Sequence, residues 1–296
     1  MSFEHQDSGT RPLRSLLHGP GPLLAPGAYD ALSARLVEEA GFGAVYMTGF
    51  GTAASRLGRP DVGLLTMTEM VDAARAIVQA VRVPVIADAD TGYGNPLNVI
   101  RTVHEYERAG VSAIHLEDQV TPKRCGHMQG KQVVPAGDMA QKIRAAVASR
   151  TTPDFLIIAR TDARAVEGLD SAIERARRYR EAGADLLFVE APQSEAEVEQ
   201  VARELRDAPL LFNWAEGGRT PPLSIDRLRE LGYALVIFPI STLLSATTMV
   251  RRSLEKIRCQ GTPAAALPEL VGFGDFLDFI GLPEIDALGQ RYTDAG

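Results

Sequence analysis

Acidic side chains end two neighbouring apolar segments of this sequence. Asp88 and Asp90 end the run PVIADAD, and Glu117 lies near the end of the run AIHLEDQ. Side chains at positions i and i+2 of a strand point to the same face, so Asp88 and Asp90 are expected to converge. Three carboxylates that lie together repel one another unless a cation lies between them. Because oxygen ligands suit Mg²⁺, with Mn²⁺ as the alternative, we predict a metal site at these three acids.

A competing interpretation treats these acids as solvated loop residues or as caps of the helices that follow. For Asp118 alone, we favour that interpretation. For Asp88, Asp90 and Glu117 together we favour the metal site, because buried apolar segments in adjacent repeats all end in acids.

A cationic loop carries the first of two cysteines. Cys125 lies in residues 121–131, TPKRCGHMQGK, beside Lys123, Arg124 and His127. Positive charge favours the thiolate, so we expect a lowered thiol pKa and a group suited to proton transfer. A nucleophilic Cys125 and His127 pair, or a His127 that only orients the loop, remain alternatives. Cys259 fits the more common interpretation of a cysteine, an inert small hydrophobic residue.

Other apolar segments also end in polar residues. Arg160 ends the fifth segment and needs an anionic partner, for which a substrate carboxylate and Glu190 are both candidates. The turn Thr48-Gly49-Phe50 after the second segment has the donors of a small anion-binding site. Asn213 ends the seventh segment, and Trp214 beside it either shapes a pocket or packs in the core.

Eight short apolar segments alternate with segments of helical period, which indicates βα units and a parallel sheet. Several helical segments end in Ala-Gly or Leu-Gly, at 40–41, 109–110, 182–183 and 231–232, where glycine suits a left-handed helix cap. We therefore predict a single (β/α)8 barrel of the TIM type, whose carboxyl-end loops form the active face. The expected organisation is an N-terminal extension over 1–20, the barrel over 21–258 with a catalytic loop over 121–131, and a helical tail over 259–296. That tail is expected to pack on the barrel or on a neighbouring subunit.

Composition excludes several classes of partner. The 296 residues include 31 Lys plus Arg and 38 Asp plus Glu, a formal net charge of −7. Nucleic acid and anionic membranes demand clustered positive charge, so neither is expected as a partner. No apolar run approaches the roughly 20 residues that span a bilayer, and the first residues lack the apolar core of a signal peptide. Two cysteines are too few for a disulfide framework, so we expect a cytoplasmic protein with free thiols.

Specific motifs resemble the isocitrate lyase and phosphoenolpyruvate mutase superfamily. They are MTGFGTAASRLGRPDVG, VIADADTGYGN, HLEDQVTPKRCGH, IIARTDAR, FVEAP and NWAEGGRTP, and the resemblance runs from about Leu23 to Ile240. It implies a TIM-type barrel whose eighth helix, here the segment after Ile240, is exchanged between subunits. It also implies a homotetramer built as a dimer of such swapped dimers.

The resemblance implies a role for each matching residue. Asp88 resembles the direct Mg²⁺ ligand, and Asp90 and Glu117 resemble ligands that act through water. Cys125 is similar to the residue that protonates the departing enolate, with Lys123 and His127 in support. Tyr46 is a candidate base for the substrate hydroxyl, with a structural role as the alternative. The residues implied to surround or hold the substrate are Thr48, Gly49, Phe50, Asp61, Arg160, Glu190 and Asn213.

The implied activity is cleavage of a 2-hydroxy di- or tricarboxylate, of the substituted malate or 2-methylisocitrate type. The products are an α-keto acid and a carboxylate. Phe50 and the run Glu216-Gly217-Gly218 differ from methylisocitrate lyases and are more like 2,3-dimethylmalate lyases, oxaloacetate hydrolases and carboxyphosphonoenolpyruvate mutase-like members. The alternatives are therefore a phosphonomutase and an oxaloacetate hydrolase or decarboxylase. Outside enzymes, the alternative is a catalytically silent barrel that acts as a binding partner.

Overall fold

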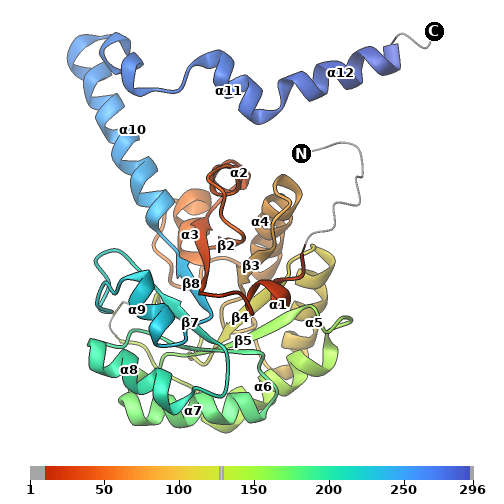
Figure 1. Ribbon diagram of the computed structural model, residues 1–296, viewed down its shortest axis with the longest axis vertical. Coiled ribbons are helices and arrows are strands. Elements are labelled where there is room, and N and C mark those ends of the chain that lie inside the picture. Colours follow the sequence, from red (N-terminus) through yellow and green to blue (C-terminus); the bar gives the residue numbers. More distant parts are fainter. Residues whose placement is uncertain (1–10, 127, 129, 294–296) are drawn as a thin grey trace. The chain divides into compact units, whose positions relative to one another are not determined.

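The computed structural model describes residues 11–126, 128 and 130–293. Eight parallel strands form a closed barrel in chain order, and β1 pairs with β8 to complete it, for example at Leu24 and Val236 (Figure 1). The predicted TIM-type barrel is confirmed. The strands are β1 (Leu23–Ala28), β2 (Val45–Met47), β3 (Val85–Asp88), β4 (Ala113–Glu117), β5 (Leu156–Thr161), β6 (Leu186–Val189), β7 (Leu210–Asn213) and β8 (Leu235–Phe238).

Helices follow the strands and cover the outside of the barrel, except the first helix, which precedes β1 and packs Leu13 against residues inside the barrel. Those up to β8 are α1 (Leu13–Leu16), α2 (Ala31–Glu39), α3 (Gly49–Leu57), α4 (Met67–Ala80), α5 (Pro96–Arg108), α6 (Ala136–Ser149), the 3-10 turn η1 (Ala163–Ala165), α7 (Leu169–Glu181), α8 (Glu195–Glu204) and α9 (Ile225–Glu230). Side chains cap several of them, as at Asn95, whose amide oxygen accepts from the backbone of Leu97 and Asn98 before α5. Gly110 and Gly183 adopt left-handed φ angles of 87° and 105°, as the predicted helix ends require.

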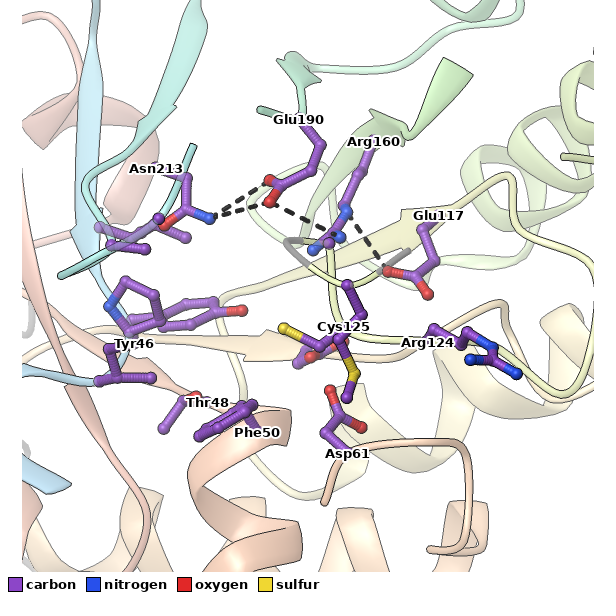
Figure 2. A pocket seen from close by; sticks show the side chains of 18 of the residues that line it. Tyr46, Thr48, Phe50, Asp61, Glu117, Arg124, Cys125, Arg160, Glu190 and Asn213 are labelled. Atoms are coloured by element: carbon purple, nitrogen blue, oxygen red, sulfur yellow. Dashed lines mark hydrogen bonds and ion pairs between the residues drawn. The ribbon is translucent and has the colours of Figure 1, made fainter. Parts of the chain in front are cut away.

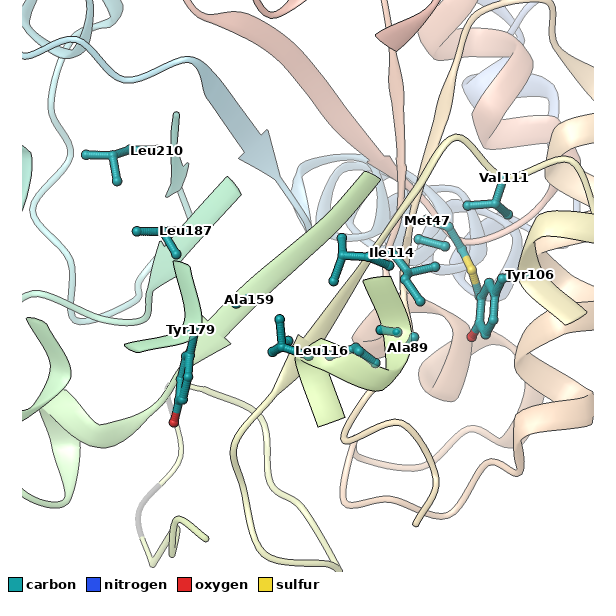
Figure 3. Close-up of a cluster of buried hydrophobic side chains, with 14 of the residues drawn as sticks. Met47, Ala89, Tyr106, Val111, Ile114, Leu116, Ala159, Tyr179, Leu187 and Leu210 are labelled. Atoms are coloured by element: carbon teal, nitrogen blue, oxygen red, sulfur yellow. The ribbon is translucent and has the colours of Figure 1, made fainter. Parts of the chain in front are cut away.

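Alternate residues of each strand point into the barrel or out toward the helices. In β4, Ile114 and Leu116 belong to the outer core between strands and helices, where Tyr106 and Tyr179 also lie (Figure 3). The inner core contains alternate residues of the other strands, including Tyr46, Ile158 and Phe188. The same alternation turns His115 and Glu117 of β4 inward. Strand period therefore determines which polar side chains reach the interior of the barrel.

Among the described residues, contacts divide the chain into one unit that ends at Leu243 and a second unit that begins at Leu244. The remaining helices are α10 (Ser241–Gln260), the 3-10 segment η2 (Ala264–Glu269), α11 (Phe273–Ile280) and α12 (Leu282–Thr293). Within the second unit, Lys256 Nζ lies 2.6 Å from Glu269 Oε1. The predicted boundary at residue 258 and the exchange of the last barrel helix stay predictions. In the part of the chain described, no helix has the length and apolar character needed to cross a membrane.

Candidate active site

The loops at the carboxyl ends of the strands surround a pocket, seen from close by in Figure 2. Gly49 and Asp90 adjoin it, because Gly49 lies against Asp88 and Asp90 contacts Lys123. His127 lies outside the described residues. The structure thus brings the other predicted residues to one place, and their roles stay predictions. Those that line the pocket are Tyr46, Thr48, Phe50, Asp61, Asp88, Glu117, Lys123, Cys125, Arg160, Glu190 and Asn213.

A lysine ammonium lies among the acids at the pocket. Lys123 Nζ is 2.6 Å from Asp61 Oδ1 and 2.7 Å from Asp90 Oδ1, and all three side chains are buried. Burial raises the pKa of Asp90 to about 6, although the charge of Lys123 opposes that rise. Within residues 11–126, 128 and 130–293, no three His, Cys, Asp or Glu side chains form a ready metal cluster. Here the chain itself supplies a cation among the acids.

Glu117 is a buried acid with an unsatisfied oxygen. Its Oε1 atom is buried and has no hydrogen-bond partner, and its Oε2 atom lies 3.3 Å from Arg160 Nε. Burial raises the pKa of Glu117 well above its usual value, against the lowering effect of Arg160 and Lys123. An oxygen of this kind is costly unless something binds it, so Glu117 offers a ligand position that faces the pocket.

Arg160 contacts three acids, of which Figure 2 shows Glu117 and Glu190. Its Nε and Nη2 atoms donate to Asp162 at 2.9 and 3.1 Å, and Nη2 lies 4.0 Å from Glu190 Oε1. Asn213 Nδ2 then donates to both oxygens of Glu190 at 3.2 and 3.3 Å. Although burial opposes its charge, Asp162, Glu190 and Glu117 raise the pKa of Arg160, so the guanidinium stays charged. The geometry is therefore compatible with both candidate partners of Arg160, Glu190 and a substrate carboxylate.

The N-terminus of α3 reaches the same pocket. Thr48 caps the helix, since its Oγ1 accepts from the Gly51 backbone at 3.2 Å. At Gly49 an added Cβ would collide with Asp88 Oδ2, so only glycine lets this turn approach the carboxylate. The first N–H groups of a helix lack partners within the helix and carry partial positive charge. The turn therefore places the N-terminus of α3 beside Asp88, and its role in binding an anion stays a prediction.

His115 belongs to the site although it was not among the predicted site residues. It is completely buried in β4, and its Nε2 lies 2.7 Å from the Tyr46 hydroxyl and 3.4 Å from Asp88 Oδ1. Burial lowers its pKa to about 4, despite the opposing effect of Asp88, so the imidazole is neutral at pH 7. Burial and Asp88 raise the pKa of Tyr46 well above 10, so the phenol keeps its proton. The only available signal for His115 was its position two residues before Glu117 on the same strand face.

The cationic loop lies over this constellation. Cys125 is half-buried, and its backbone N–H donates to the Asp61 carbonyl at 3.2 Å. An added Cβ at Gly126 would collide with Glu190 and Arg160, so the loop backbone lies directly against them. Cys259, by contrast, is exposed on α10 and bonds to Glu255. Of the two cysteines, Cys125 is the one whose thiol belongs to the pocket.

The surroundings of Asp118 and Trp214 decide between the alternative interpretations given for each residue from the sequence. The interpretation of Asp118 as solvated is wrong, because it is fully buried and accepts from Thr161 at 2.7 Å and Tyr179 at 2.7 Å. It points away from Glu117, toward α7, as strand alternation requires. Trp214 packs rather than shapes the pocket: its indole N–H donates to the Leu223 carbonyl at 3.1 Å, and its ring lies 6.1 Å from that of Phe238.

The fold and the pocket define a class of protein, the TIM-barrel enzymes whose pocket lies at the carboxyl ends of the strands. The Phosphoenolpyruvate phosphomutase family model matches residues 13–258, and the chain belongs to the phosphoenolpyruvate mutase and isocitrate lyase superfamily.

Three similar proteins show the range of this superfamily. The chain is 49% identical over 281 residues to 2,3-dimethylmalate lyase of Eubacterium barkeri, an alignment that covers 95% of this chain and 97% of the relative. A structure of oxaloacetate acetylhydrolase with 3,3-difluorooxalacetate matches with a TM-score of 0.89, 39% identity and 98% coverage of both chains. A structure of phosphonopyruvate hydrolase with oxalate and Mg²⁺ matches with a TM-score of 0.87 and 31% identity, covering 95% of this chain and 98% of that one. A close homologue is thus a named lyase, and a more distant one has been solved with a divalent cation.

Proposed function

We propose that this protein is a divalent-metal-dependent lyase that cleaves the bond between C2 and C3 of a 2-hydroxy di- or tricarboxylate. The observation that carries the proposal is the convergence of three kinds of group on one pocket. The pocket is lined by the buried carboxylates of Asp88 and Glu117, the permanently charged guanidinium of Arg160 and the half-buried thiol of Cys125. The 49% identity to a 2,3-dimethylmalate lyase supports a substituted malate as the substrate.

The acids fit a Mg²⁺ or Mn²⁺ ion. Asp88 would be the direct ligand, and Asp90 and Glu117 would act through water. Glu117 Oε1, which is buried without a partner, is the kind of oxygen that a hydrated cation satisfies. When bound, the ion would polarise the substrate oxygens and offset the negative charge that develops as the bond breaks.

The pocket has two groups of donors for substrate carboxylates. On one side of the pocket, the charged guanidinium of Arg160 contacts Glu117 and Asp162. Asn213 lies on the same side, where its amide donates to Glu190, which in turn lies near Arg160. The Thr48 and Gly49 turn offers the N-terminus of α3 on the other. We infer that these groups hold the two ends of a dicarboxylate across the acid cluster, with Phe50 and Asp61 as further walls of the pocket.

Proton transfers are assigned to side chains at the pocket. Cys125 would donate a proton to the departing carboxylate enolate, which is the step that releases the second product. Lys123 would hold Asp61 and Asp90 in place beneath it, and His127 would support the same loop. Tyr46 keeps its proton at neutral pH, which favours hydrogen-bond donation to a substrate oxygen over proton abstraction. Its assignment as the hydroxyl base stays a prediction.

A substrate panel tests the proposal. With Mg²⁺ present, keto-acid release is followed from 2,3-dimethylmalate, 2-methylisocitrate, isocitrate and oxaloacetate, and phosphonopyruvate is followed by phosphorus NMR. Release from a substituted malate is the expected result. Turnover of oxaloacetate alone would instead indicate a hydrolase or decarboxylase, and a new phosphorus signal alone would indicate phosphonate chemistry. Silence throughout, with no stabilisation by Mg²⁺ and oxalate, would indicate a barrel that only binds a partner.

We also propose a cytoplasmic homotetramer, a dimer of dimers that exchange the helix after Ile240. Helices α10, α11 and α12 contain no buried residue, and large apolar side chains such as Leu254 and Phe273 are 58% and 79% exposed. Exposed apolar surface of this extent marks an association surface. Light scattering of the purified protein should give the mass of four chains, and a monomer would contradict the exchange.

A further inference from the structure

One ammonium group joins the thiol-bearing loop to the guanidinium of the pocket. Lys131 Nζ lies 2.8 Å from Asp162 Oδ1 and donates to the Gly126 carbonyl. Its side chain is 2% exposed, and that of Asp162 is fully buried. Lys131 ends the loop that was predicted to be catalytic, Asp162 directly follows β5, and 31 positions separate the two residues.

Asp162 is the shared partner of two cations. Its Oδ1 accepts from Lys131 and from Arg160 Nη2, and its Oδ2 accepts from Arg160 Nε at 2.9 Å. Burial alone would raise the pKa of Asp162, but Arg160 and Lys131 outweigh it and lower that pKa far below the usual value. The carboxylate therefore stays charged, and charge-assisted hydrogen bonds of this kind are short and directional.

Gly126 is the other end of the connection. An added Cβ there would collide with Glu190 Oε1 and Arg160 Nη2, so the backbone at Gly126 packs directly against the guanidinium and leaves no space for a side chain. Cys125 immediately precedes it. The first half of the loop has its own anchor, because Gln119 bonds to the backbone N–H and carbonyl of Arg124 at 2.9 and 2.8 Å. Lys131 thus holds the backbone of Gly126, the residue directly after the thiol.

We propose that Lys131 is a positioning residue, which fixes Gly126, and with it the Cys125 thiol, against Arg160 through the carboxylate of Asp162. Lys131 does not line the pocket, so it acts through these groups rather than on a substrate. The proposal concerns the placement of the thiol, and it stands or falls independently of which acid the enzyme cleaves.

Alkylation by iodoacetamide tests it without a substrate. The chain contains a built-in reference, because Cys125 is half-buried within the loop while Cys259 is exposed on α10. Peptide mass spectrometry measures both rates in one sample of the full chain. In Lys131→Met we expect Cys125 to react about tenfold faster, because losing a charge-assisted contact favours local opening. The Cys259 rate should not change.

The direction of the change separates two explanations. If Lys131 acted only as a nearby positive charge, its removal would disfavour the Cys125 thiolate and slow alkylation. Loss of positioning would instead expose the Cys125 thiol and make its alkylation faster. Lys131→Arg keeps a donor and a charge at the same position and should react at close to the wild-type rate. Slower or unchanged alkylation of Cys125 in Lys131→Met would overturn the proposal.

A matched control tests whether the loss of any buried lysine destabilises the fold enough to accelerate Cys125 alkylation. Lys142 is also a buried lysine whose ammonium donates to a backbone carbonyl, that of Thr91 at 2.9 Å. Lys142→Met should leave the Cys125 rate unchanged, and equal acceleration in both variants would overturn the assignment to Lys131. If Lys131→Met fails to fold by circular dichroism, Asp162→Asn removes the charged partner instead. It should accelerate Cys125 alkylation, and a wild-type rate would refute the proposal.

Discussion

The Nζ atom of Lys123 lies 2.7 Å from Oδ1 of Asp90, so an ammonium group of the chain contacts a carboxylate that was predicted to bind a metal. The sequence required a positive charge among the acids but did not identify its source. Lys123 supplies one from the loop that follows β4, and it also lies 2.6 Å from Asp61. Even so, the buried carboxylate of Asp90 has a pKa raised to about 6, first by burial and then by the charges of Asp88 and Asp61.

Asp90 should therefore destabilise the metal-free protein at neutral pH. Its folded pKa is about 6 against an ordinary 3.8, so the folded state binds the proton more tightly than the unfolded state. Stability is then lost as the pH rises from about 4 to about 6. Asp90→Asn should raise the free energy of unfolding at pH 7.5 by on the order of 2–3 kcal/mol, and by little near pH 4.

Urea unfolding at the two pH values measures this difference, with chelator present. Asp72→Asn is the matched control, because Asp72 pairs with Arg75 on the exposed surface of α4. Such a pair contributes about 0–1 kcal/mol, so its loss should stabilise nothing. A destabilised Asp90→Asn variant at pH 7.5 would show that the charge of Asp90 is well compensated.

Mg²⁺ together with oxalate should stabilise the folded protein. A ligand at 100 times its dissociation constant contributes about 2.7 kcal/mol when it binds only the folded state. Thermal unfolding should therefore shift upward by a few degrees with both present. Asp88→Ala should lose this shift, because it removes the predicted direct ligand, whereas Asp72→Ala should keep it. Undiminished metal affinity in Asp88→Ala would exclude Asp88 from the ligand set.

Cys125→Ser should lose turnover but keep binding. A serine hydroxyl is a far weaker acid than a thiol, and loss of a positioned proton donor costs on the order of 10²–10⁴ in rate. The stabilisation by Mg²⁺ and oxalate should remain, since no ligand is removed. Cys259→Ser, on exposed α10, serves as the control and should match the wild type. Wild-type turnover in Cys125→Ser would show that another group donates the proton.

Strand period predicted much of the site because parallel strands end at one edge of the barrel. Asp88 and Arg160 were found as polar residues that end apolar segments, and they line one pocket. The same rule, applied one residue further, would have placed Asp118 opposite to Glu117 and beneath α7, where Tyr179 and Arg175 bind it.

Other site residues depend on contacts that no local pattern encodes. His115 lies among apolar neighbours within β4, and its partners Tyr46 and Asp88 come from β2 and β3. Lys131 and Asp162 meet across the space between the loop and β5. Such pairings follow from closure of the barrel and not from the composition of either segment.

Removing Asp118 should be costly for stability. Four donors converge on it, from Thr161, the Asp162 backbone, Tyr179 and Arg175. Asp118→Ala leaves them buried without their acceptor, and breaking a buried ion pair in this way costs about 3–5 kcal/mol. Urea unfolding should show that loss, against a loss of at most about 1 kcal/mol in Asp72→Ala. Equal losses in the two variants would show that the Asp118 network adds no net stability.

The glycine at the start of α3 should be required for activity. An alanine side chain at this position would collide with the Asp88 carboxylate, so in Gly49→Ala the acid or the helix N-terminus must move. Because displacements of about 1 Å at a site can cost 10²-fold in rate, turnover should fall by about that factor. Gly43→Ala is the control, since its added Cβ would meet only the flexible end of Leu23, at 3.3 Å. If Gly49→Ala turned over substrate like Gly43→Ala, the turn would not need its close approach to Asp88.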